Sequence, residues 1–146
     1  MMKVAFYKST RPGLTGLYNR LVRGWECGPY SHCELILTGG IAASSSFADG
    51  GVRFKNIAFN PDRWDFIEVP WANERAARAW FLANEGKAYN TIGNLHFLVG
   101  FILWHDDKKF CSQAVLESLG IVDAWRFGPN AAAALLRSVN GVTNAR

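Results

Sequence analysis

The segment SHCELILTGGIAASSSFADGGVRFK, residues 31–55, contains three predicted β-strands and the two turns between them. Polar and apolar side chains alternate in residues 31–38, which is typical of a half-buried strand. Gly39 and Gly40 form a hairpin turn, and residues 41–47 return as the antiparallel partner. After the turn at residues 49–51, residues 52–55 alternate again. This segment therefore predicts the centre of an antiparallel sheet.

The remaining elements extend this pattern to one domain. Residues 3–8 and 64–69 are predicted strands, so the first half of the chain is an antiparallel meander. Helices are expected at residues 14–22, 72–84, 111–119 and 129–139, and residues 91–104 form an apolar helix or a buried loop. We expect a single α+β domain over residues 1–146, an antiparallel β-sheet packed against helices, with a disordered tail at about 140–146.

Composition narrows the function classes. The chain has 146 residues, 49% of them hydrophobic, and a net charge of +4. Lysine and arginine are scattered, so no nucleic-acid partner is expected. Residues 92–104 are too short to span a bilayer and are favoured as core over membrane contact. The sequence shows no signal peptide, so we expect a cytoplasmic protein, or a virion-associated one if a phage encodes it.

Cys111 and His32 are the candidate catalytic pair. Cys111 is expected to open an amphipathic helix, where unpaired N–H groups and the helix dipole favour a thiolate. His32 lies on the predicted strand 31–38, and a nucleophilic cysteine and its base need to be adjacent only in the fold. The backbone N–H of Cys111 supplies one oxyanion donor, and a second comes from Tyr7, Tyr30 or Ser31.

The group that orients His32 has three candidates. Glu34 lies on the same strand face about 7 Å from His32. Ser44 and Ser46 lie on the partner strand, where cross-strand neighbours are closer. A carboxylate stabilises an imidazolium better than a hydroxyl does, whereas the hairpin geometry favours the serines. All three candidates therefore stay open.

Two other interpretations compete with catalysis. A cysteine that opens a helix is often a small buried filler, and a histidine on a strand is often a hydrogen-bonded core residue. A metal site could use Cys27, His32 and Cys33 with His96 or His105, but His32 and Cys33 point to opposite strand faces. The sequence therefore predicts no metal and no cofactor.

The motifs together resemble a known superfamily. Their order is Ser31-His32-Cys33-Glu34-Leu35, a hairpin with small residues, Gly86 to Asn90, an apolar stretch, and Phe110-Cys111-Ser112-Gln113 at a helix start. This order is similar to the circularly permuted papain-like cysteine amidases, relatives of the NlpC-type cell-wall peptidases and the lecithin:retinol acyltransferases. The resemblance spans residues 3–119 and implies a permuted papain-like fold.

The resemblance also implies residue roles and a substrate class. It makes Cys111 the nucleophile and His32 the base of a cysteine amidase or peptidase that works through a thioester. The expected substrate is a peptidoglycan peptide or another small amide. The alternatives are a lipid acyl hydrolase or acyltransferase of the same fold, and a binding or inhibitor module without activity. Gln113 and Asn90 depart from the Glu and Asp of many members, and the strand after His32 offers serines where the family has Glu or His.

Overall fold

Five strands form one antiparallel sheet in the order β4-β3-β2-β1-β5 in the computed structural model, which describes residues 1–88 and 109–144. The strands are β1 (Lys3–Tyr7), β2 (His32–Ile36), β3 (Ile41–Ser46), β4 (Gly51–Asn56) and β5 (Trp64–Glu68). All five coincide with predicted strands. Gly39 and Gly40 make the β2–β3 turn with φ of 95° and 89°, which glycine adopts without strain. The predicted α+β class is confirmed.

The prediction of a simple meander is wrong for β5. Strands β2, β3 and β4 follow one another, but β5 crosses back and pairs with β1, with Lys3 opposite Glu68. The reason lies in β1, in which residues 4–7 are all buried. An apolar strand left at a sheet edge would present unpaired backbone groups, so β1 takes a partner on each side.

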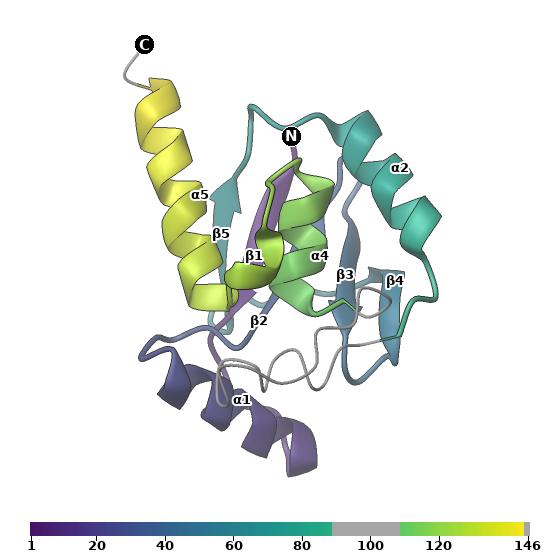
Figure 1. The fold of residues 1–146 in the computed structure, drawn as a ribbon. Helices are drawn as coiled ribbons and strands as arrows, with labels where there is room; N and C mark the ends of the chain where they lie inside the picture. The colour runs from purple at the N-terminus through teal and green to yellow at the C-terminus, as the bar shows by residue number, and fades with distance from the viewer. Residues whose placement is uncertain (89–108, 145–146) are drawn as a thin grey trace.

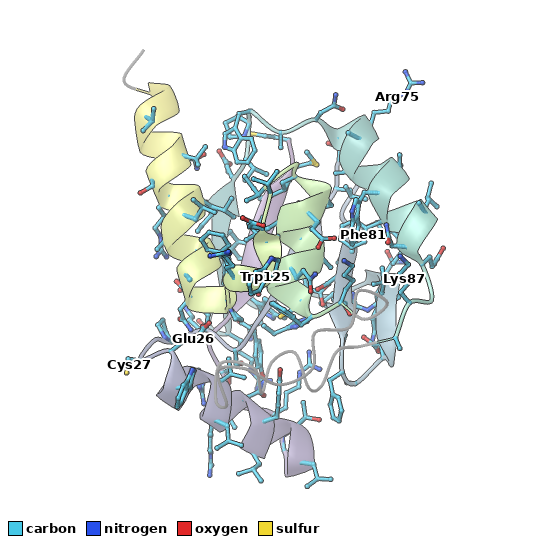
Figure 2. The ribbon with its side chains drawn as sticks, in the orientation of Figure 1. Glu26, Cys27, Arg75, Phe81, Lys87 and Trp125 are labelled. Atoms are coloured by element: carbon cyan, nitrogen blue, oxygen red, sulfur yellow. The ribbon has the colours of Figure 1, made fainter. Side chains whose placement is uncertain are left out.

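Three helices cover one face of the sheet: α2 (Glu74–Asn84), α4 (Cys111–Ser118) and α5 (Pro129–Asn144), with α4 between the other two (Figure 1). A 3-10 turn, η1 (Ala124–Arg126), joins α4 to α5. Phe81 of α2 is fully buried and packs edge-on against Phe54 of β4 (Figure 2). Asn73 caps the start of α2, because its side chain accepts from the N–H of Ala76 at 3.1 Å. None of the described helices is long and apolar enough to cross a bilayer.

Helix α4 is the central helix and is not amphipathic, contrary to expectation. Every residue from Cys111 to Ser118 except Glu117 is buried. Two of the buried polar side chains donate hydrogen bonds: Ser112 Oγ to the Phe127 carbonyl at 2.7 Å, and Gln113 Nε2 to Glu117 Oε1 at 2.8 Å. The sheet and both flanking helices thus hold the start of α4 inside the protein.

Helix α1 (Gly13–Trp25) lies across the end of the sheet at which α4 begins (Figure 1). Its apolar stripe faces outward, with exposed fractions of 82%, 56%, 52% and 52% for Leu14, Leu17, Leu21 and Trp25. Its buried residues are Gly16 and Asn19. A Cβ at residue 16 would lie 1.8 Å from a carbonyl oxygen of the preceding loop, so glycine permits the close approach. Close backbone packing and polar contacts therefore determine which face is buried.

The tail prediction is corrected by α5, which continues to Asn144, so residues 140–144 are helical. Asn140 holds this last part of the helix, because it accepts from Trp71 Nε1 at 2.9 Å and donates to the Glu68 carbonyl at 2.7 Å. At the other end of α5, Asn130 both donates to the Tyr30 carbonyl and accepts from the Tyr30 N–H, each at 2.8 Å. These bonds attach α5 to the loop that precedes His32. The predicted apolar element at 91–104 lies outside the described residues.

Candidate active site

Cys111 and His32 meet at the end of the sheet where β2 and α4 both begin. Cys111 is the first residue of α4 and His32 the first of β2. The chain just before α4 is held by Ser45 of β3, whose hydroxyl donates to the Lys109 carbonyl at 2.5 Å. The side chains of Cys111 and His32 are close enough that each shifts the pKa of the other, upward for the imidazole and downward for the thiol. The two predicted residues, 79 positions apart in the chain, are therefore neighbours in the fold.

Glu34 is the group that contacts His32. Its Oε1 lies 2.7 Å from His32 Nε2, and Glu34 is completely buried. The separation is far shorter than the roughly 7 Å expected along a strand, because both side chains lean toward each other. With Nε2 engaged by the carboxylate, Nδ1 is the ring nitrogen left for Cys111. The carboxylate thereby sets the orientation of the ring.

The two serines do not take this position. Ser44 Oγ donates to the Cys33 carbonyl at 2.7 Å, so its proton is engaged with the backbone of β2. Ser46 and His32 both line a cleft that is described below. Of the three candidates, Glu34 is the one with a direct hydrogen bond to the imidazole among the described contacts.

Arg53 completes the arrangement and was missed by the sequence interpretation. Its NH1 and NH2 donate to the two carboxylate oxygens of Glu34 at 2.7 and 2.6 Å, a bidentate pair. The register aligns Leu35 with Ala43 and Ser44 with Arg53, so Glu34, Ser44 and Arg53 share one row across three strands. Because the middle residue is a small serine, the arginine of β4 reaches past it to β2.

Arg53 is itself held from behind. Asp49 accepts from Arg53 Nε at 2.9 Å and from Lys55 Nζ at 2.6 Å. The hydrogen bonds from Lys55 and Arg53 outweigh burial and lower the pKa of Asp49 to about 2. The sequence did carry a signal for this network: residues 52–55 alternate, which puts Arg53 and Lys55 on one strand face. Alternation alone does not give the strand register, and it is the register that places this face beside Glu34.

The charges of the site favour an ion pair between Cys111 and His32. Burial opposes the charged imidazole, but its Coulombic attraction to Cys111 and its hydrogen bonds to Cys111 and Glu34 raise the pKa of His32 to about 9. Burial likewise opposes the Glu34 carboxylate, yet the hydrogen bonds from Arg53 and His32 lower its pKa. A carboxylate, an imidazolium and a thiolate thus alternate in sign through the site.

Cys33 is a second residue that the sequence interpretation did not place in the site. A hydrogen bond from its thiol is the largest cause of the lowered pKa of Cys111, and the nearby imidazolium of His32 adds to it. Burial and the neighbouring sulfur raise the pKa of Cys33, so Cys33 stays a neutral donor. Cys27, the third cysteine, is exposed on the loop after α1 (Figure 2).

Replacing Cys33 tests this donor. We expect Cys33→Ala to raise the pH midpoint of iodoacetamide labelling at Cys111, because the thiolate loses its strongest hydrogen bond. Cys33→Ser keeps a donor of similar size, so its midpoint stays nearer that of the unaltered protein. Both variants are made with Cys27→Ala, which removes the exposed thiol. Equal midpoints for Cys33→Ala and the parent would contradict the role of the donor.

A cleft leads to the pair from the side of α1. The cleft is narrow, with about 20 Å³ open to a water-sized molecule, and its lining includes Tyr7, Arg11, Asn19, Ser31 and His32. Because Cys111 is only 1% exposed, His32 marks the point where the cleft reaches the pair. Of the oxyanion-donor candidates, Tyr7 and Ser31 line this cleft, whereas the Tyr30 hydroxyl donates to Asp65 at 2.9 Å.

The other sequence-derived candidates are placed as follows. Gln113 lies buried in the first turn of α4 with its Oε1 lacking a partner among the described atoms. Asn90, His96 and His105 lie outside the described residues. Within residues 1–88 and 109–144, no three histidine, cysteine, aspartate or glutamate side chains gather as a metal site would require. No protein-family model matches this chain, and neither does any curated protein.

Proposed function

We propose that this chain is a cysteine hydrolase with a permuted papain-like fold, in which Cys111 is the nucleophile, His32 the acid and base, and Glu34 the orienting group. The observation that carries the proposal is the buried series of contacts from Cys111 through His32 and Glu34 to Arg53. Buried ion pairs contribute little to stability, so a series of them that ends on a thiol fits a catalytic arrangement better than a structural one.

The geometry supports amide or ester hydrolysis through a thioester. The thiolate of Cys111 attacks the carbonyl carbon, and the developing oxyanion is met by the N–H of Cys111 at the start of α4. The imidazolium of His32 then gives its Nδ1 proton to the leaving amine or alcohol. In the second half of the reaction, His32 takes a proton from a water molecule. The water attacks the thioester, which releases the carboxylic acid and restores the Cys111 thiolate. Throughout, Glu34 keeps the ring oriented and stabilises its positive charge.

The proposed substrate is an amide in a peptidoglycan stem peptide or in another small peptide. The resemblance to cell-wall amidases supports this class, and the cleft lining includes Arg11, Asn19 and Ser31, whose polar groups suit a peptide. The proposed setting is the cytoplasm, or a virion if the chain is phage-encoded.

Purified muropeptides test the substrate class. We expect the Cys27→Ala protein to cleave one amide bond, seen by mass spectrometry as two fragments whose masses add up to the parent plus one water. A matched sample of the Cys111→Ala variant should leave the muropeptide intact, because removal of the nucleophile lowers the rate of hydrolysis about 10⁶-fold.

A parallel sample with a long-chain acyl ester separates the alternatives. Hydrolysis of the ester beside intact muropeptides would replace the peptidase with a lipid acyl hydrolase. If neither substrate reacts and the Cys111 thiol titrates like an ordinary one, the chain is a binding module that lacks hydrolase activity.

A further inference from the structure

The cleft beside His32 contains a buried polar atom that nothing in the described structure satisfies. Ser31 is 2% exposed, it lines the cleft next to His32, and its Oγ has no hydrogen-bond partner among the described atoms. An unsatisfied buried hydroxyl destabilises a folded protein, so such groups are rare unless a ligand engages them. Ser31 Oγ is therefore a donor available to a bound molecule.

Arg11 gives the same cleft a positive charge. Its guanidinium lies over the ring of Tyr7, 5.4 Å from the centroid, and the loop is held by a bond from the Arg11 N–H to Asn19 Oδ1 at 3.3 Å. No described carboxylate pairs with this guanidinium, whereas Arg53 is paired with Glu34. Arg11 is thus a placed cation without an anion in the described part of the chain.

The described residues that line the cleft supply no negative charge for Arg11. No aspartate or glutamate is among the described residues that line the cleft, and the first turn of α1 has no acidic residue. The imidazolium of His32 adds a second positive group at the inner end. A planar guanidinium with a neighbouring hydroxyl donor matches the two oxygens of a carboxylate, whereas a phosphate with its larger charge requires more donors.

We propose that this cleft binds a carboxylate of the substrate, with Arg11 as its counter-ion and Ser31 as a hydrogen-bond donor. The inference rests on the proposed function, because it places the carboxylate beside the bond that Cys111 attacks. It makes Arg11 a specificity-determining residue: substrates with a free carboxylate next to the scissile amide bind better than their amidated counterparts.

Two reagents of nearly equal size test the proposal at Cys111 itself. Iodoacetate carries a carboxylate and iodoacetamide does not, so the ratio of their alkylation rates reports how the cleft treats a carboxylate. In the Cys27→Ala protein we expect Arg11→Gln to lower this ratio about tenfold, the effect of removing one partly screened charge. Ser31→Ala should lower the ratio of the two rates less than Arg11→Gln does. Arg11→Lys should leave the ratio close to that of the parent.

Arg20→Gln is the matched control, because Arg20 is an exposed arginine of α1 that does not line the cleft. Its ratio should equal that of the parent. In the unaltered cleft, acetate should slow iodoacetate labelling and acetamide should not, which gives a second test if Arg11→Gln fails to fold. An unchanged ratio in Arg11→Gln, or equal effects of acetate and acetamide, would overturn the proposal.

The same data separate this inference from the proposed hydrolase. If both reagents react slowly and His32→Ala changes neither rate, the activated cysteine is wrong, while the ratio still reports on the carboxylate site. If iodoacetamide reacts fast but the ratio of the two alkylation rates is the same in Arg11→Gln as in the parent, the proposed hydrolase is retained and the carboxylate site is wrong. Stronger protection by phosphate than by acetate would replace the carboxylate with a phosphate group.

Discussion

Replacing His32 by alanine is expected to raise the pH midpoint of iodoacetamide labelling at Cys111 part of the way to about 8.5, the value of an unperturbed thiol, because the hydrogen bond from Cys33 remains. In the intact site the midpoint lies well below that, because hydrogen bonds from Cys33 and the charge of His32 stabilise the thiolate. Hydrolysis by the variant should fall by about 10⁴-fold or more, since the same ring protonates the leaving group. The labelling rate is measured by mass spectrometry across pH 4 to 10.

The direction in which the rate of hydrolysis changes with pH follows from the pKa shifts of Cys111 and His32. The thiolate forms as the pH rises through the lowered pKa of Cys111, and the imidazolium is lost as the pH rises through about 9, the pKa of His32. Hydrolysis that needs both is therefore expected to fall above pH 9, whereas alkylation, which needs only the thiolate, stays high. A labelling curve that rises only near pH 8.5 in the parent and is the same without His32 would contradict the activated pair.

The stability of the folded protein follows the same titration. Folding raises the pKa of His32 from its ordinary value of 6.5 to about 9. The stabilisation from this imidazolium is therefore complete below pH 6.5 and is lost as the pH rises through 9. The lowered pKa of Cys111 works in the opposite sense, because its contribution is lost as the pH falls through the folded value.

Replacing Arg53 by methionine is expected to have the largest effect on stability, a loss of about 3–5 kcal/mol in the free energy of unfolding. The physical reason is that Glu34 is completely buried and would keep a charge with His32 as its remaining partner. For a domain of this size the melting temperature should drop on the order of 10 °C. Differential scanning calorimetry with urea titration at pH 7 measures both quantities.

Two control variants separate the buried charge from loss of side-chain volume. Lys55→Met removes a cation from the same network, but Lys55 is 49% exposed, so its effect should stay within the range of surface ion pairs, about 0–1 kcal/mol. The double variant Glu34→Gln with Arg53→Met removes both charges and should recover part of the loss. If the double variant is as unstable as the sum of the two single ones, the buried carboxylate is not the cause.

The pH dependence of the Arg53 variant provides another check. In the intact protein the pKa of Glu34 is lowered, so the carboxylate contributes stability above its ordinary value of 4.5 and loses it as the pH falls through the folded pKa. Without Arg53 the carboxylate takes up its proton more readily. The stability difference between the two proteins should therefore narrow as the solution becomes acidic.

Local sequence patterns determined most of the secondary structure. Alternation in residues 31–55 predicted β2, β3 and β4, and Gly39-Gly40 marked the hairpin, because two consecutive positive φ angles require residues such as glycine. Asn73 capped α2 as its side chain predicts. The end of α4 was also readable, since Gly120 follows its last residues and glycine commonly ends a helix. These features depend on neighbours in the chain.

The contacts that shape the site depended on the tertiary structure. Arg53 reaches Glu34 only because the register of three strands aligns them across a small serine, and Cys33 lowers the pKa of Cys111 only because α4 packs on β2. The burial of polar residues in α1 depends on how closely Gly16 lets two backbone segments approach. Periodicity specifies which residues share a face, but strand register and helix docking specify what that face meets. The sequence therefore determined the strands, the helix start and the candidate pair, and only the packed fold decided the partners that charge and orient it.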